Sequence, residues 1–234
     1  MELTDPGSAG PGRGGLKAAV FDLDGTLIDT EPRNREMWVR MFTANGIAHD
    51  EALIASFAGR RGREVLAELL HLFPGRTVED LFHEVVSYET GPGMPPVKPV
   101  PGAVELVRAL HAAAVPVAVV TSGVRGYAEG LLDGLGIKEL LDVLVTADDV
   151  ANGKPDPEGF LAACDALGVA PRDALGFEDA PAGVAAVKAA GMTCVGITTT
   201  QPAAALAAAD RVVADMTEVD LRAWGLPARG EHEE

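Results

Sequence analysis

Short apolar runs alternate with amphipathic stretches along most of the chain. The runs are continuous and lack the apolar–polar alternation of a strand that faces water on one side. Continuous runs are typical of parallel strands covered by helices on both faces. We therefore predict an α/β fold with a Rossmann-like open parallel sheet as its core. The predicted strands are 18–22, 115–120, 142–146, 174–178, 193–197 and 211–214, and the predicted helices between them are about 102–113, 124–135, 157–168 and 181–190.

Residues 30–95 break this rhythm, because they contain no convincing strand. Three helical patterns fill the segment, namely EPRNREMWVRMFTANG, REVLAELLHLF and VEDLFHEVVSYE, and the proline-rich connector GPGMPPVKPVPG follows them. We predict an all-helical cap domain over 30–96, inserted into a core formed by 16–29 and 97–226. Two crossings would join the cap to the core and let it open and close over a site.

Composition and charge narrow the environment and the partners. The formal net charge of -16 argues against nucleic acid and against an anionic membrane, but it leaves room for a small anionic substrate in a locally positive pocket. The two cysteines, Cys164 and Cys194, are far apart and in no metal-ligand spacing, which favours a reduced, cytoplasmic location. No signal peptide or membrane-spanning run is evident. We interpret 1–15 as a disordered tail and 227–234 as an acidic tail.

The stretch FDLDGTLID places two aspartates, Asp22 and Asp24, directly after the first predicted strand. Side chains two apart along a strand face the same way, so both carboxylates can reach one site at the carboxyl end of the sheet, with Gly25 permitting a sharp turn. Two carboxylates that close repel each other unless a cation lies between them. Mg²⁺ suits such oxygen ligands. A calcium loop is excluded, because its sixth and twelfth positions would be Leu27 and Arg33.

Polar residues also follow the next predicted strands. VVTSG places Thr121, Ser122 and Gly123 at a helix start, where hydroxyls and backbone amides can bind an anion; an ordinary helix N-cap would explain the same pattern. NGKPDP places Lys154 in a loop, where most lysines are simply solvated.

A second acidic pair ends the fourth predicted strand. In LGFEDAPAG, Glu178 and Asp179 stand just before the helix that begins near Pro181, so an N-cap is again the alternative explanation. Each of these segments is a weak signal alone. The four strand ends carry carboxylates, hydroxyls, a lysine and carboxylates, in that order. Together they indicate a single site.

These four segments resemble the four motifs of the haloacid dehalogenase superfamily, in register over about residues 17–214. The helical insertion is similar to the type 1 cap of the subgroup that holds β-phosphoglucomutase and small sugar-phosphate phosphatases. FEDAPAG and VKAAG look especially close to sugar- and polyol-phosphate phosphatases. The matching residues are Asp22, Asp24 and Thr26 for motif one, Thr121 and Ser122 for motif two, Lys154 for motif three, and Glu178 and Asp179 for motif four.

The resemblance implies hydrolysis through a covalent aspartyl-phosphate. Asp22 would attack phosphorus, and Asp24 would protonate the leaving oxygen and then accept a proton from the attacking water. Mg²⁺ would be held by the Asp22 carboxylate, the Asp24 backbone carbonyl and the Asp179 carboxylate, with Glu178 nearby. The other implied roles are charge stabilisation on the transferring oxygens by Thr121, Ser122 with Gly123, and Lys154, and support of the Asp24 loop by Thr26.

Substrate choice is expected to lie in the cap. GRRGREV supplies Arg60, Arg61 and Arg63, which either form a solvated basic face or send one side chain, for which we favour Arg61, into the closed site. Glu31 could contact substrate hydroxyls or simply favour the start of its helix.

The predicted function is hydrolysis of a small sugar or polyol phosphate. The alternative with the same fold is a β-phosphoglucomutase-like isomerase, which would need a cap that grips a second phosphate. A non-enzymatic scaffold would be expected to have lost one of Asp22, Asp24, Lys154 and Asp179, and all four are present. The expected partner is a small phosphorylated metabolite, and the sequence says little of oligomeric state, for which a monomer is the working expectation.

Overall fold

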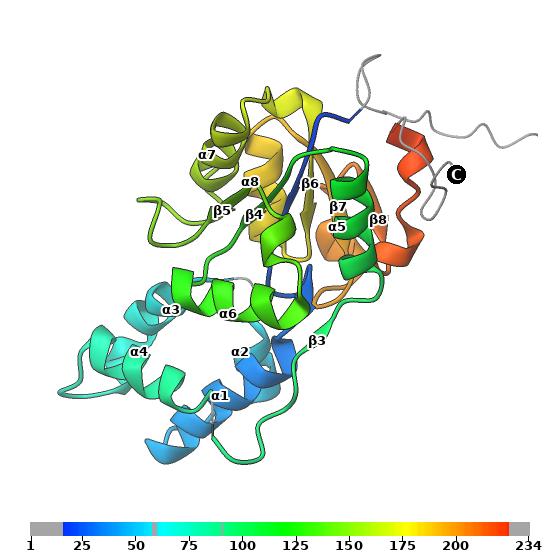
Figure 1. Ribbon diagram of the computed structural model, residues 1–234. Coiled ribbons are helices and arrows are strands. Elements are labelled where there is room, and N and C mark those ends of the chain that lie inside the picture. Colours follow the sequence, from blue (N-terminus) through cyan, green and yellow to red (C-terminus); the bar gives the residue numbers. More distant parts are fainter. Residues whose placement is uncertain (1–15, 58–59, 90, 225–234) are drawn as a thin grey trace, which may run out of the picture.

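A computed structural model describes residues 16–57, 60–89 and 91–224, so the predicted tails lie outside the described residues. Six parallel strands form the main sheet in the order β5-β4-β1-β6-β7-β8 (Figure 1). The sequence predicted all six, and their observed ends differ from the predicted ends by two residues at most. The strands are β1 (Ala18–Phe21), β4 (Val117–Val120), β5 (Val143–Val145), β6 (Ala174–Glu178), β7 (Thr193–Ile197) and β8 (Arg211–Val213).

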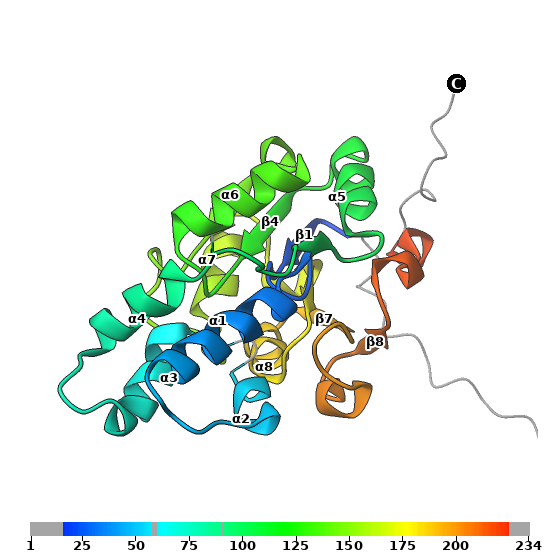
Figure 2. The same cartoon turned by 90° about the horizontal axis from the view of Figure 1, so that it is seen from below.

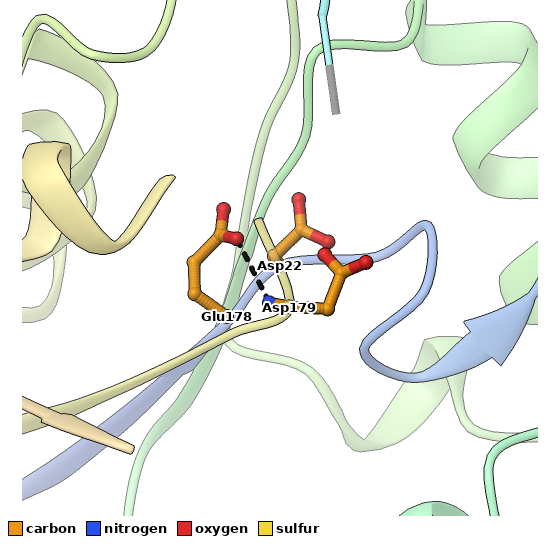
Figure 3. A group of neighbouring side chains, drawn as sticks. All are labelled: Asp22, Glu178 and Asp179. Atoms are coloured by element: carbon orange, nitrogen blue, oxygen red, sulfur yellow. Dashed lines mark hydrogen bonds between the residues drawn. The ribbon is translucent and has the colours of Figure 1, made fainter. Parts of the chain in front are cut away.

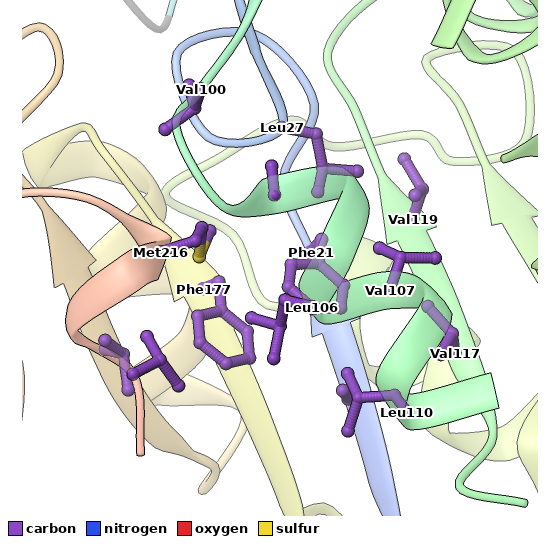
Figure 4. Close-up of a cluster of buried hydrophobic side chains, with 14 of the residues drawn as sticks. Phe21, Leu27, Val100, Leu106, Val107, Leu110, Val117, Val119, Phe177 and Met216 are labelled. Atoms are coloured by element: carbon purple, nitrogen blue, oxygen red, sulfur yellow. The ribbon is translucent and has the colours of Figure 1, made fainter. Parts of the chain in front are cut away.

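Four helices cover the two faces of this sheet, and the alternation along β1 shows how. Ala19 and Phe21 pack with α5 (Ala103–Ala112) and α6 (Arg125–Leu135), whereas Ala18 and Val20 pack with α7 (Glu158–Leu167) and α8 (Pro181–Ala189). Both faces are buried, which is why the strands are continuously apolar. In Figure 4, Phe21 and Phe177 lie beneath α5, and their rings stack with centroids 4.5 Å apart.

The cap helices span Glu31–Ser87 and lie together (Figure 2). They share a hydrophobic core of their own, against which Tyr88 also packs. Trp38 and Phe57 pack at its centre with ring centroids 4.9 Å apart. The short helix α2 was not predicted, because five residues carry too little periodicity to reveal a helix. The cap helices are α1 (Glu31–Ala44), α2 (Glu51–Ala55), α3 (Gly62–Leu69), continued by a 3-10 helix over Leu70–Leu72, and α4 (Val78–Ser87).

The chain crosses between sheet and cap through two adjacent segments. β2 (Ile28–Asp29) and β3 (Lys98–Pro99) pair antiparallel, so the outgoing and returning segments lie side by side. The sequence analysis did not predict this two-stranded ribbon. The division of the chain into domains at residues 30 and 96 stays a prediction.

Membrane insertion through a helix finds no support in the part of the chain that the structure describes. None of the helices within 16–57, 60–89 and 91–224 combines the length and the apolar character that a membrane span requires.

Candidate active site

Three buried carboxylates meet where β1 and β6 end (Figure 3). The two strands pair so that Phe21 lies opposite Phe177, and the Asp22 amide continues the ladder by donating to the Phe177 carbonyl at 3.0 Å. This register brings Asp22 beside Glu178 and Asp179. One carboxylate oxygen from each of the three lies within 4.8 Å of the others. The acids predicted from strands 156 residues apart therefore form one cluster.

Lys154 is the cation of this cluster. Its ammonium donates to Asp22 Oδ1, to Glu178 Oε1 at 2.6 Å and to the Val120 carbonyl at 3.2 Å, so each of its three protons has an acceptor. Burial alone would lower the pKa of Lys154, but the carboxylates of Asp22 and Glu178 outweigh it and raise that pKa. Lys154 therefore stays charged in the site. The alternative interpretation, a solvated loop lysine, is wrong.

One hydrogen-bond acceptor of the carboxylate cluster is unused among the described residues. Asp22 Oδ2 is buried and has no hydrogen-bond partner among the described residues. Burial, followed by repulsion from Glu178 and Asp22, raises the pKa of Asp179 well above its usual value. One lysine does not neutralise three carboxylates. Unpartnered carboxylate oxygen together with this excess negative charge fits a hard divalent cation, which Asp22 and Asp179 could hold.

Glu178 has a more structural set of contacts than the other two acids. Its Oε1 accepts from Lys154, and its Oε2 accepts from the backbone amides of Asp179 at 2.9 Å and Ala180 at 3.0 Å. Burial, only partly offset by Lys154, raises the pKa of Glu178. Gly183 makes room for this side chain, since a Cβ there would lie 1.7 Å from Glu178 Oε1. The N-cap alternative is wrong here, because α8 is capped by Ala180 without a side-chain hydrogen bond.

The turn after Asp24 closes tightly over Asp179. Gly25 has a φ of +85°, and a Cβ at this position would lie 2.0 Å from Asp179 Oδ2. Only glycine meets both demands, which explains the glycine of the DxDG motif. Asp179 Oδ2 also accepts a hydrogen bond from the Thr200 hydroxyl. The sequence analysis missed Thr200; the only signal was a run of three threonines just after β7.

Asp24 lies beside the cluster in a cage of hydroxyl groups. Thr30 and Tyr127 each donate to its Oδ1 at 2.6 Å, and Thr121 approaches its Oδ2 at 3.5 Å. Burial and then repulsion from Asp22 raise the pKa of Asp24, although the Thr30 and Tyr127 donors work against this. The sequence analysis assigned the supporting role to Thr26. The Thr26 hydroxyl is buried without a hydrogen-bond partner in the described chain, whereas the Thr30 hydroxyl donates to Asp24, so a supporting role for Thr26 stays a prediction.

The segment after β4 turns toward the cluster before α6 begins. Thr121 Oγ1 accepts from the Gly123 amide at 3.0 Å and so stabilises the turn, and Ser122 and Gly123 line the cavity described next. The N-cap alternative does not hold for this segment either. The cap residue of α6 is Val124, with no side-chain hydrogen bond.

A cavity of about 440 Å³ separates the carboxylates from the cap. Asp22, Asp24 and Asp179 line its floor, and cap side chains that include Trp38 and Phe57 line the opposite wall. The volume falls in the range of sites that enclose small organic ligands. Motif segments one, two and four therefore face this cavity under the cap, and Lys154 of motif three reaches the same cluster through Asp22 and Glu178.

The three arginines of the GRRGREV segment, Arg60, Arg61 and Arg63, differ in their contacts. Arg60 pairs with Glu68, and Arg63 pairs with Glu79 at 2.7 Å. Arg61 lies 3.9 Å from Glu64 and also reaches the core, where its Nε is buried without a hydrogen-bond partner in the described residues.

Arg61 rests on the loop that carries Lys154. A Cβ on Gly153 would lie 2.4 Å from Arg61 Nε, so this glycine provides the space for the arginine. Glu31 also lines the cavity, from the start of α1, with Arg35 at 3.9 Å. Burial raises the pKa of Glu31 to about 7, against the opposing effect of Arg35.

Comparisons with known proteins agree with this geometry. A family model of haloacid dehalogenase-like hydrolases matches residues 16–191. Validoxylamine A 7'-phosphate phosphatase of Streptomyces hygroscopicus subsp. limoneus is 52% identical over 203 residues, covering 87% of this chain and 95% of the relative. Hexitol phosphatase A of Escherichia coli (strain K12) is 34% identical, covering 77% of this chain and 82% of the relative.

A solved structure extends the agreement to the fold. β-Phosphoglucomutase from Clostridium difficile matches with a TM-score of 0.75 at 26% identity, covering 88% of this chain and 94% of that one. The α/β fold and the resemblance inferred from the four motifs are confirmed. With a family model that spans most of its length, this chain belongs to the haloacid dehalogenase-like hydrolases.

Proposed function

We propose that the protein is a Mg²⁺-dependent phosphatase that hydrolyses a phosphorylated sugar or polyol through an aspartyl-phosphate on Asp22. The observation that carries the proposal is the unpartnered, buried Asp22 Oδ2 in a carboxylate cluster beside Lys154 and a ligand-sized cavity. The curated relatives are phosphatases of validoxylamine A 7'-phosphate and of hexitol phosphates, which supports a phosphoric monoester hydrolase with a carbohydrate-like substrate.

The first half-reaction forms the covalent intermediate. An oxygen of Asp22 attacks phosphorus, the bond between phosphorus and the ester oxygen breaks, and Asp24 gives that oxygen a proton so that it leaves as an alcohol. Lys154 holds the Asp22 carboxylate through Oδ1, which leaves Oδ2 for the attack. Mg²⁺, held by Asp22 and Asp179, would supply the positive charge that lets an anionic nucleophile approach an anionic ester.

The second half-reaction restores the enzyme. A water molecule attacks the phosphorus of the aspartyl-phosphate, the bond to Asp22 breaks, and Asp24 accepts the proton that the water loses. The products are inorganic phosphate and the unmodified Asp22 carboxylate. Asp24 is suited to both steps, because burial and repulsion from Asp22 raise its pKa and so favour the protonated form more than in an exposed aspartate.

The substrate range can be tested with a panel of phosphate esters. Purified protein with Mg²⁺ is assayed for phosphate release from validoxylamine A 7'-phosphate, a hexitol phosphate, glycerol 3-phosphate and β-glucose 1-phosphate. We expect the carbohydrate phosphates to be hydrolysed with kcat/KM values at least about tenfold apart, because the cap wall selects among them. Absence of phosphate release from every ester would contradict the proposal.

The mutase alternative has one observation in its favour, the fold shared with β-phosphoglucomutase. A mutase must hold a second phosphate, and Arg60, Arg61 and Arg63 each lie within 4 Å of a glutamate. We therefore favour hydrolysis. With β-glucose 1-phosphate, the phosphatase releases glucose and phosphate, whereas glucose 6-phosphate as the product would establish the mutase.

A further inference from the structure

The two carboxylate oxygens of Asp24 differ in their hydrogen bonds. Oδ1 accepts two short hydrogen bonds, from Thr30 Oγ1 and from Tyr127 Oη, both at 2.6 Å. Among the described residues, the hydrogen-bond partner of Oδ2 is the Thr121 hydroxyl, at 3.5 Å. A carboxylate oxygen has two lone pairs, so two O–H donors fill Oδ1. A proton carried by Asp24 then has room only on Oδ2.

The direction of both hydrogen bonds follows from their surroundings. Thr30 Oγ1 accepts from the side-chain amide of Asn34 at 3.3 Å, so its own proton is free to point at Asp24. The Tyr127 hydroxyl donates its proton to Asp24 Oδ1. Neither donor belongs to the four motifs. Thr30 precedes the first cap helix, and Tyr127 is on α6 of the core, 103 residues further along the chain than Asp24.

The position of Tyr127 depends on the motif-two turn. Its ring lies against Gly123, where a Cβ would be 2.8 Å from Tyr127 Cδ1. Tyr127 also lines the cavity, together with Asp24 and Thr30. The glycine therefore lets the aromatic ring lie across the turn and place its hydroxyl on Asp24.

We propose that Tyr127 is a positioning residue that, together with Thr30, fixes Asp24 through Oδ1 and leaves Oδ2 as the oxygen that exchanges the catalytic proton. This inference rests on the proposed phosphatase function. In the forward step the proton moves from Oδ2 to the ester oxygen as the P–O bond breaks. In the hydrolytic step Oδ2 takes a proton from water as the bond between Asp22 and phosphorus breaks.

The test compares leaving groups. An alkoxide leaves poorly and needs the proton, whereas 4-nitrophenolate leaves readily and needs it much less. For each enzyme, the ratio of kcat/KM for the best alkyl phosphate of the panel to kcat/KM for 4-nitrophenyl phosphate is measured. We expect Tyr127→Phe to lower this ratio about tenfold, the effect of losing one hydrogen bond to a charged group. Asp24→Asn provides the larger reference effect.

The controls separate positioning from folding. Tyr88→Phe removes a tyrosine hydroxyl in the cap that donates to Glu84 at 3.3 Å, outside the cavity, and should leave the ratio as it is. Thr30→Val should lower the ratio in the same way as Tyr127→Phe, and Thr30→Ser should restore it. Circular dichroism and melting of every variant report the fold.

The outcomes are distinguishable. Activity of the unaltered enzyme on the alkyl phosphate tests the proposed function itself. If that activity is present and Asp24→Asn lowers the ratio, a wild-type ratio in Tyr127→Phe and Thr30→Val would overturn the positioning role. A lowered ratio in both, with Tyr88→Phe unchanged, would support it.

Discussion

Asp22 divides its two oxygens between two environments. Oδ1 is bound by Lys154, and Oδ2 is buried without a partner among the described residues. A buried oxygen without a hydrogen-bond partner destabilises the fold, and such atoms are found where they have a functional role. In the proposed mechanism that role is the attack on phosphorus.

Replacement of this residue is the first prediction. Asp22→Asn should lower kcat by at least about a thousandfold, since an amide cannot form the acyl-phosphate. Phosphate release measures the loss, and melting shows whether the fold survives. Asp173→Asn, which alters a carboxylate paired with Lys17 at 2.9 Å just before the start of β6, away from Glu178 at its other end, should keep full activity. Turnover by Asp22→Asn near the wild-type rate would disprove the nucleophile assignment.

Glu31 supplies the second prediction, on pH and stability. Burial raises its pKa from 4.5 to about 7, with a smaller contribution from Asp29 and Asp24 and an opposing one from Arg35. A folded pKa above the unfolded value means that the folded state binds the proton more tightly, so this residue makes the protein less stable as pH rises from about 4.5 to 7.

The matched variant isolates this effect. Glu31→Gln has no such titration, so the free energy of unfolding of the variant should exceed that of the wild type by about 1–2 kcal/mol at pH 8, with little difference at pH 4.5. Urea unfolding at the two pH values measures it. An equal difference at both pH values would show that Glu31 does not titrate differently in the folded state.

At the scale of elements, helix α8 meets β6 closely at Gly183, next to the Glu178 side chain. Gly183→Ala should destabilise the protein by about 2–4 kcal/mol and lower activity, because the new methyl group would collide with Glu178. Gly130→Ala is the matched control in α6, where a Cβ would meet nothing within 4 Å, and it should stabilise by about 0.5–1 kcal/mol. Urea unfolding compares the two. Destabilisation of similar size at both sites would mean that the Glu178 contact is not the cause.

The contact between Arg61 and Gly153 joins the cap to the motif-three loop. Arg61→Ala should raise KM for the best carbohydrate phosphate by about tenfold, since a half-buried cation that lines the cavity would be lost. Gly153→Ala should act in the same direction, by displacing the arginine. Arg76→Ala removes a cap arginine that pairs with Glu84 at 2.8 Å outside the cavity. A KM increase in that control equal to the other two would point to a general loss of cap structure.

Elements with strong periodicity or long apolar runs were predictable from the sequence. The main strands and helices were found because continuous burial leaves a continuous pattern. α2 was missed because five residues carry too little periodicity to reveal a helix. β2 and β3 were missed because these two-residue strands form by pairing with each other across a distant part of the chain. For the same reason the sequence could not reveal that Tyr127 and Thr200 touch Asp24 and Asp179. Motif residues were recognisable, whereas residues that hold them in place were not.

At the scale of the whole molecule, the sheet and the cap together line the cavity that contains the carboxylates. These carboxylates repel one another unless a cation offsets their negative charge. We predict that EDTA abolishes phosphatase activity and that Mg²⁺ restores it. Mg²⁺ should also raise the melting temperature of the wild type, because it binds only the folded state. Asp179→Asn should lose most of this rise, whereas Asp173→Asn should retain it. Undiminished activity in EDTA would refute the metal requirement.

The central claim is that Asp22 accepts the phosphoryl group while a divalent cation offsets the negative charge around it. A crystal structure with Mg²⁺ and beryllium trifluoride, a mimic of a bound phosphoryl group, tests it most directly. The account predicts the beryllium bonded to a carboxylate oxygen of Asp22 and the Mg²⁺ in contact with Asp22 and Asp179. Beryllium on another residue, or the ion away from these two carboxylates, would contradict it.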